Sequence, residues 1–521
     1  METRSARDGG CSPWRCASVC HSSHMPCTAR RPRLFLYDAS IGIPPWGMTH
    51  DARLYFLFDR IRRSSHFTPN GDCADFFLIH NYVSTRGMSS ARVLALFDRI
   101  AAEYPHWNRT ANLGLRHFLV SPCDHGAGDC MYDRTEHPAN YLDDRPHGIV
   151  KWRDIDIRAT TRRVGLLTLN GHEGGATNFR RSMDIRLPSF DNHECGPYCG
   201  VPSHHGQHQR AIARRILRHY SPWSETQPRR LRARRRWRLF FAGRATLGGA
   251  RGDLFKHHSQ RQSFLIHDTS GRHPPSIHHN KVNVTKKSFF AEGMSSSDFC
   301  FVPLGQSDGD SDRYLPALLY GCVPVFASGK AEAKPFEEVI RWEDFSLDLP
   351  GGPAQVKGLH QFLSKVDDTR LYAMRRAMAA VWPKMLWTSV SGSTYLGEPK
   401  SSDAFATLMA VLAKRLSSMY KCPDGATQVR RMFYRCQTAR EPTSTPPRAA
   451  LRAAIDFHNG FLKPFMRSTH RRGEESETAA VAEQLTRPPS PCCFAVVCRR
   501  PSTSPTSSKT IETTLSAHSH R

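Results

Sequence analysis

The chain has 521 residues and a mass of 58.9 kDa, more than one hydrophobic core usually supports, so we expect about two domains of roughly 200 residues each. Lys and Arg number 73 against 47 Asp and Glu, and the net charge of +26 excludes an ordinary acidic cytosolic protein. This excess indicates a polyanionic or phosphorylated partner, or else a basic surface segment. A hydrophobic content of 39% excludes wholesale disorder, because that much apolar surface can bury a core.

Apolar runs in the sequence are short. The longest, at 54–58 and 494–497, fall far below the ~18 residues that a membrane-spanning helix needs. The first ten residues also lack the apolar stretch of a secretory signal. We therefore predict neither a membrane span nor a signal peptide in this sequence.

Sixteen cysteines are too few for a disulfide scaffold and more than a reduced enzyme usually carries. They crowd the two ends of the chain, and the rest are scattered, some at short spacings such as Cys195 and Cys199. Two sequons, at Asn108 and Asn283, predict N-glycosylation. Together these features favour passage through an oxidising compartment.

Composition divides the chain into four parts. Residues 1–31 are rich in Cys, Ser and Arg and are predicted to be a Cys-rich tail or the remnant of a small module, and residues 440–521 a disordered Pro/Ser/Arg-rich tail. Between them, short apolar runs alternate with amphipathic stretches, which is typical of an α/β fold. In the first half of this region we expect strands at 33–37, 75–80, 117–121, 164–169 and 184–187, and helices at 91–104 and 211–220.

The second half shows the alternation more clearly. We expect strands at 239–242, 263–267, 299–303 and 323–327, and helices at 254–260, 289–294 and 312–320. This alternation predicts βαβ units and a parallel sheet covered on both faces. Because ligands of such sheets bind beyond the carboxyl ends of the strands, we expect a site near Gly243, Gly305 and Ser328.

A run of seven arginines between 229 and 238 separates the two halves. Its position suits an interdomain hinge over a cleft. A nucleic-acid-binding reading is weak, because only Trp237 interrupts the run as an aromatic and no recognised nucleic-acid module accompanies it. A solvated basic face explains the run more simply.

The segment after the strand at 299–303 is the densest in chemistry. It passes Gly305 and Ser311 and enters a helix beside Arg313, and a helix N-terminus with a nearby guanidinium favours a diphosphate. The alternative is an ordinary Ser or Asp cap on a loop-to-helix turn.

Glycine and arginine also follow the strand at 239–242. Gly243 lets the backbone approach a ligand, and Arg244 and Arg251 can reach a phosphate. The alternative is a surface turn without a ligand. A P-loop, a serine-hydrolase elbow and a dinucleotide glycine fingerprint are all absent from the sequence.

In the first half, Asp124 and His125 follow the strand at 117–121, where either can serve as a general base facing a cleft. The alternative is a turn in which Asp124 caps a backbone N–H. A zinc site is a further candidate between 193 and 208, where two cysteines three residues apart are followed by histidines. No second cysteine pair completes it, so a local disulfide or a surface loop is the simpler explanation.

Taken together, the blocks in chain order resemble the exostosin-type glycosyltransferases, glycosyltransferase family 47. The matching blocks are Y-P-H-W-N-R-T (104–110), H-F (117–118), D-H-G (124–126), D-I-R-L-P (184–188), L-F-F-A-G (239–243), S-D-F-C-F-V-P-L-G (297–305), S-D-R (311–313), G-C-V-P-V (321–325), P-F (335–336) and W-E-D-F-S (342–346). They extend over about residues 33 to 347, and their order makes the resemblance specific.

The resemblance implies a GT-B architecture of two Rossmann-like domains facing a cleft. Residues 32–228 would form the acceptor domain and 229–439 the nucleotide-sugar domain. It implies inverting transfer without a catalytic metal or other cofactor, from a nucleoside-diphosphate sugar to a polysaccharide or glycoprotein glycan. Donor contacts are expected at Pro303, Gly321 and Pro324, besides the glycines, Ser311 and arginines named above.

One departure from the family pattern concerns Pro316. Many members carry Asp or Glu three residues after the arginine of the S-x-R block, where this chain has proline. The alternative function is therefore a noncatalytic binding or partner subunit with the same fold. From the family we further expect a lumenal location at the Golgi or secretory-pathway membrane, homo- or hetero-oligomers with related transferases, and no nucleic-acid partner.

Overall fold

The computed structural model describes residues 31–37, 53–79, 90–110, 115–121, 164–173, 179–189, 207–245, 249–270, 288–305, 312–391 and 396–420. The chain divides into a unit of residues 1–428 and a second unit of residues 429–521, and every described residue lies in the first. The two tails predicted to be Cys-rich and disordered lie outside the described residues, apart from Arg31.

The first sheet contains five parallel strands that follow one another in space in the order of the chain. They are β1 (Leu34–Leu36), β2 (Phe76–Ile79), β3 (His117–Ser121), β4 (Gly165–Thr168) and β5 (Ile185–Arg186). The helices of this half are α1 (Arg53–Arg62), α2 (Ser90–Glu103), α3 (Pro105–Thr110) and α6 (Gln207–Tyr220). The strands and helices expected from the sequence are confirmed here to within a few residues at each end.

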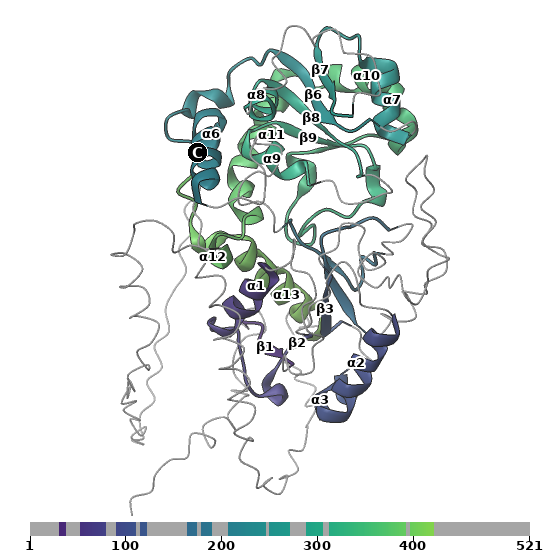
Figure 1. The fold of residues 1–521 in the computed structure, drawn as a ribbon, viewed down its shortest axis with the longest axis vertical. Helices are drawn as coiled ribbons and strands as arrows, with labels where there is room; N and C mark the ends of the chain where they lie inside the picture. The colour runs from purple at the N-terminus through teal and green to yellow at the C-terminus, as the bar shows by residue number, and fades with distance from the viewer. Residues whose placement is uncertain are drawn as a thin grey trace, which may run out of the picture. The chain divides into compact units, whose positions relative to one another are not determined.

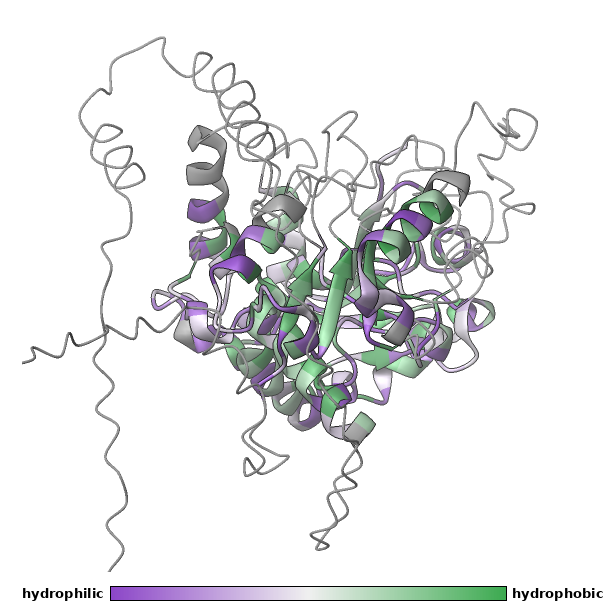
Figure 2. Cartoon of the chain, turned by 90° about the horizontal axis from the view of Figure 1, so that it is seen from below, coloured by the Kyte–Doolittle hydropathy of each residue, from purple (hydrophilic) through white to green (hydrophobic). Residues whose placement is uncertain are grey.

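Strand residues of the first sheet alternate between two buried faces. Leu34, Phe76 and Phe118 belong to one large core, whereas Phe35 and Phe77 belong to a second, smaller core. Successive side chains of a strand point to opposite sides, so these unbroken apolar runs require cover on both faces. Figure 2 shows the green, apolar strands among helices that carry purple, polar residues.

The second sheet is also parallel, with its strands in the order β10-β9-β8-β6-β7. Its strands are β6 (Trp237–Gly243), β7 (Phe264–Asp268), β8 (Ser297–Val302), β9 (Val323–Phe326) and β10 (Leu347–Asp348). The helices between them are α7 (Gly249–His258), α8 (Phe289–Ser295) and α9 (Tyr314–Leu319). Figure 1 shows these helices around the sheet, and the expected α/β class is confirmed in both halves.

Further helices, which are not among the elements expected from the sequence, follow the second sheet. They are α10 (Leu359–Ser364), α11 (Asp368–Val381), α12 (Thr388–Ser391) and α13 (Ala404–Tyr420). The last two return to the first half: the Arg60 guanidinium lies 4.3 Å from the centre of the Phe405 ring and bonds Ser389, and Arg415 donates to the carbonyl of Asp184 at 2.7 Å. The predicted domain boundaries at 228 and 439 stay predictions.

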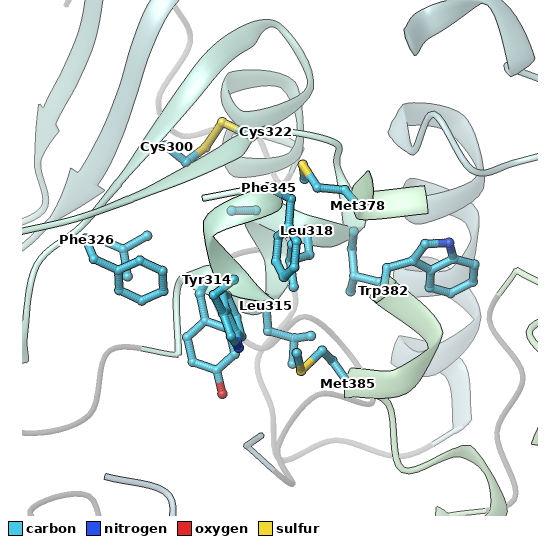
Figure 3. Close-up of a cluster of buried hydrophobic side chains, with 14 of the residues drawn as sticks. Cys300, Tyr314, Leu315, Leu318, Cys322, Phe326, Phe345, Met378, Trp382 and Met385 are labelled. Atoms are coloured by element: carbon cyan, nitrogen blue, oxygen red, sulfur yellow. A yellow bond between two sulfur atoms is a disulfide. The ribbon is translucent and has the colours of Figure 1, made fainter. Parts of the chain in front are cut away.

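A compact apolar cluster surrounds α9. Tyr314 and Leu318 of this helix pack among Phe326, Phe345 and Met378, as Figure 3 shows. A disulfide between Cys300 and Cys322 lies beside the cluster and joins β8 to the turn before β9. The core therefore fixes α9, whose first residues approach the expected ligand edge of the sheet.

The described residues contain no helix long and apolar enough to cross a membrane.

Candidate functional site

The order of the second sheet locates a ligand edge. The chain starts at β6, places β7 on one side and then β8, β9 and β10 on the other, so the direction of winding reverses between β6 and β8. In open parallel sheets such a reversal opens a crevice at the carboxyl ends of the two strands. Here those ends are Gly243 and Val302, followed by Pro303 and Gly305, which agrees with the edge expected from the sequence.

Gly243 and Arg313 meet at this edge. A Cβ atom at position 243 would overlap Nη2 of Arg313, so glycine leaves room for the guanidinium in its present position against the end of β6. The guanidinium carbon also lies 5.2 Å from the centre of the Phe241 ring. The half-buried Arg313 thus brings a permanent positive charge to the carboxyl end of β6, which favours an anionic ligand there.

The guanidinium of Arg251 is not wholly available for a phosphate contact, because part of it already bonds the backbone. It is 8% exposed, and its Nε donates to the carbonyl of Leu304 at 2.9 Å. This bond ties α7 to the loop after β8. Arg251 therefore fixes the ligand edge, while its contact with a donor stays a prediction. Arg244, one residue beyond β6, is exposed.

Asp268, which the sequence analysis does not single out, organises the end of β7. One of its carboxylate oxygens accepts from the backbone N–H of Ala245 at 2.9 Å, and from the N–H and hydroxyl of Ser270 at 2.8 and 2.6 Å. These bonds hold the turns after β6 and β7 together. An aspartate directly after an apolar strand is the only sequence signal for this role.

Gly321 and Pro324 do not lie at the ligand edge. Gly321 occupies the turn that leads into β9, with a φ of +66°, and Pro324 is the second residue of that strand. Both are therefore near the amino end of the sheet. A Cβ at position 321 would overlap Pro222, so this glycine permits a close approach of two chain segments.

The arginine run reaches the edge of the second sheet opposite the ligand edge, and its interpretation as a hinge stays a prediction. Arg235 donates to the carbonyls of Met294, Ser297 and Tyr320. These three residues lie where α8 and α9 end and β8 begins, so the run packs against the amino ends of the second sheet's strands. Arg238 donates to the carbonyls of Leu363 and Val366 and pairs with Asp298. Arg235 and Arg238 are thus held at the edge opposite the ligand site.

The two halves meet through a buried ion pair. Arg186 at the end of β5 and Glu332 after β9 are each 1% exposed in their side chains, and Nη1 lies 2.7 Å from Oε1. The other carboxylate oxygen of Glu332 accepts from the hydroxyl of Ser328. Backbone bonds run beside this pair, from Ala333 N–H to the carbonyl of Gly171 at 2.9 Å and from Phe336 N–H to that of Arg186 at 3.0 Å.

Four of the predicted site residues lie outside the described residues: Asp124, His125, Ser311 and Asn283. The zinc alternative falls largely there as well, and within the described part of the chain no group of His, Cys, Asp or Glu is arranged to hold a metal ion. Asn108 is exposed on α3, as its predicted glycosylation requires.

The fold and this edge define an α/β protein with a candidate ligand site at the switch point of its second sheet, and comparison with known families names the class. Residues 46–361 match the Exostosin GT47 domain, so the chain belongs to this family of glycosyltransferases. The resemblance to this family that the sequence blocks indicate is thereby confirmed. GT-B, with two Rossmann-like halves, is the corresponding fold class.

Individual relatives are distant. A protein of Arabidopsis thaliana described as a probable glycosyltransferase is 26% identical over 267 residues, which is 50% of this chain and 42% of that protein. Among solved structures, the Anabaena protein HepE in complex with UDP and glucose is 13% identical, with a TM-score of 0.23, over 75% of this chain and 100% of HepE.

Proposed function

We propose that the protein transfers a hexosyl or pentosyl group from a nucleoside-diphosphate sugar to a hydroxyl group of a polysaccharide or a glycoprotein glycan. The observation that carries the proposal is Arg313 against Gly243, at the carboxyl end of β6 and inside the region that matches the family. A guanidinium fork there suits the two phosphates of such a donor.

In the proposed reaction the acceptor oxygen attacks the anomeric carbon of the donor sugar, with inversion. The bond between that carbon and the diphosphate oxygen breaks as the new glycosidic bond forms, and the acceptor proton passes to a base. Asp124 or His125 is the predicted base. Arg313 would stabilise the charge that develops on the departing diphosphate, and it does so without a metal ion.

The proposed location is the lumen of the Golgi or another part of the secretory pathway. The Cys300–Cys322 disulfide supports it, because disulfides persist in oxidising compartments. The exposed sequon at Asn108 also supports it, because N-glycosylation occurs in the same pathway.

The first prediction tests the donor site. The purified full chain should hydrolyse or transfer from at least one sugar in a panel of UDP- and GDP-sugars, detected as released nucleoside diphosphate. Arg313→Ala should lower this turnover about 100-fold, because a charged group aimed at the leaving diphosphate is lost. Gly243→Ala, which displaces the guanidinium, should lower it as well. Arg376→Ala, at an exposed position of α11, should leave it unchanged.

The second candidate function is a noncatalytic partner subunit, and Pro316 favours it. This residue lies in the first turn of α9, where proline is tolerated but cannot supply a carboxylate to donor hydroxyls. If no donor in the panel binds or reacts, the transferase proposal fails. If Pro316→Glu then gains donor binding, the partner-subunit function is the better one.

A further inference from the structure

The segment from 207 to 238 holds an unusual concentration of arginine. It contains eleven arginines and no lysine, against a single acidic residue, Glu225. A guanidinium presents a planar fork that matches a carboxylate or a sulfate group in two hydrogen bonds, which lysine cannot do. The composition therefore suits recognition of such groups better than a general attraction to negative charge.

The structure separates ten of these arginines into two sets, and the side chain of Arg210 lies outside the described part. Arg230, Arg235 and Arg238 are held by backbone carbonyls, and this accounts for them as structural residues. A second set is exposed and makes no hydrogen bond or ion pair with the described residues. We call this set the arginine surface: Arg214, Arg215, Arg218, Arg229, Arg232, Arg234 and Arg236.

Aromatic rings support part of the arginine surface. The guanidinium carbon of Arg232 lies 4.8 Å from the centre of the Tyr372 ring, and that of Arg236 lies 4.6 Å from the centre of the Trp237 ring. A guanidinium that stacks on a ring keeps its N–H groups at the rim, where they remain able to donate. These two side chains are thus oriented without using up their donors.

A pocket adjoins the arginine surface between α6 and the start of α8. Its volume is about 540 Å³, within the range of small-ligand sites, and its lining includes Arg215, Arg218, His219, Tyr220 and Thr226. Cationic forks, an aromatic ring and a hydroxyl around one hollow match an acidic sugar, which presents a carboxylate or sulfate, an apolar ring face and hydroxyls.

The position of the pocket is fixed by contacts with the second half. Tyr220 donates to Glu292 of α8 at 2.8 Å, and directly after it Ser221 donates to the carbonyl of Leu319 at 2.6 Å, where α9 ends. The Leu319 contact lies on the amino-end side of the second sheet, and the pocket extends from there to Ser288 at the start of α8. The seven residues of β6 separate that side from Gly243 by about 20 Å. A ligand in this pocket would leave the donor edge open.

We infer that the pocket and the arginine surface form a second glycan-binding site, one that holds an acidic polysaccharide through its carboxylate or sulfate groups. The choice of a glycan over other polyanions rests on the proposed function. The site is distinct from the donor edge, so its role is to retain a long acidic chain on the enzyme.

Direct binding measurements test this inference without any use of a donor. The full chain should bind a short oligogalacturonate and heparin, by calorimetry or fluorescence anisotropy, and should not bind neutral dextran. The double variant Arg215→Gln/Arg218→Gln should weaken binding at least tenfold. The control Arg62→Gln/Lys400→Gln removes the same charge from exposed positions elsewhere and should change binding less than twofold.

The two glycans distinguish the two anionic groups that the site could recognise. Binding of oligogalacturonate alone assigns a carboxylate ligand, and binding of heparin alone assigns a sulfate ligand. The inference is overturned if neither binds, if both double variants weaken binding equally, or if a DNA duplex binds more tightly than either glycan. If the purified chain binds these glycans but reacts with no donor sugar, that result contradicts the proposed function and leaves this site intact.

Discussion

His117 shows how a family block can serve packing instead of chemistry. It is fully buried at the start of β3, where its ring stacks 4.7 Å from Phe77 and its Nε2 lies 2.7 Å from the hydroxyl of Tyr37. Burial, together with the positive charge of Arg116, lowers the pKa of His117 to about 3. The block that contains it therefore builds the smaller core of the first half, beside Trp107.

The second prediction concerns this histidine and pH. Because the pKa of His117 falls from 6.5 in the unfolded chain to about 3 in the folded one, the unfolded chain binds the extra proton between these values. Its contribution to stability is complete above about pH 6.5 and is lost as pH falls towards 3. At pH 5 the loss should be about 2 kcal/mol.

Unfolding by urea at several pH values measures this effect. His117→Gln should lower stability at pH 7.5 but flatten the decline towards pH 5, since glutamine cannot take up the proton. His219→Gln, at an exposed position of α6, serves as the control and should keep the wild-type slope. An unchanged slope in His117→Gln would show that other groups cause the acid sensitivity.

At the scale of elements, the Cys300–Cys322 disulfide links β8 to the turn before β9. The segment between the two cysteines contains the loop after β8, Arg313 and all of α9. Both cysteines are buried, at 3% and 0% exposure. The bond therefore closes the part of the chain that delivers Arg313 to the ligand edge, and it limits how far α9 can move.

The third prediction removes this bond. Cys300→Ala/Cys322→Ala should lower the free energy of unfolding by about 3 kcal/mol, because a cross-link at a separation of 22 residues restricts the unfolded chain. Chemical denaturation of the variant and of the wild type, each with and without reductant, measures the loss. If both thiols of the native protein react with an alkylating reagent before any reduction, the disulfide is absent in solution.

At the scale of the whole described region, the Arg186–Glu332 pair couples the two halves. Burying two charges is costly unless each is fully bonded, and here Arg186 also donates to the carbonyl of Leu169 at 2.9 Å. Removal of one partner leaves the other charge buried without its counter-ion. The pair therefore links β5 specifically to the segment after β9.

The fourth prediction is a double-mutant cycle on this ion pair. Arg186→Met alone should destabilise the protein by about 3–5 kcal/mol, whereas adding Glu332→Gln should recover part of that loss, because no unpaired charge remains. Glutamine can still accept from Ser328. Urea unfolding of both single variants and the double variant measures the coupling, and strictly additive losses would contradict a direct interaction.

The sequence by itself determined the local structure and the family. Apolar runs of strand length and their alternation with amphipathic stretches predicted nine strands, from β1 at 33–37 to β9 at 323–327, since these signals depend only on neighbours in the chain. The helices after β10 were missed. Two of them, α12 and α13, pack on the first half, and neighbours in the chain do not indicate such distant partners. Blocks in a fixed order identified the family without any knowledge of contacts.

Only the tertiary structure decided which residues of the matched blocks meet. It brought Arg313 against Gly243, seventy positions apart, and left Gly321 at the opposite end of the sheet, although both glycines belong to family blocks. It also placed the arginine run at the amino ends of the strands and split it into structural and exposed residues. Such outcomes depend on strand order and on the fit of side chains across the chain, and a linear pattern carries neither.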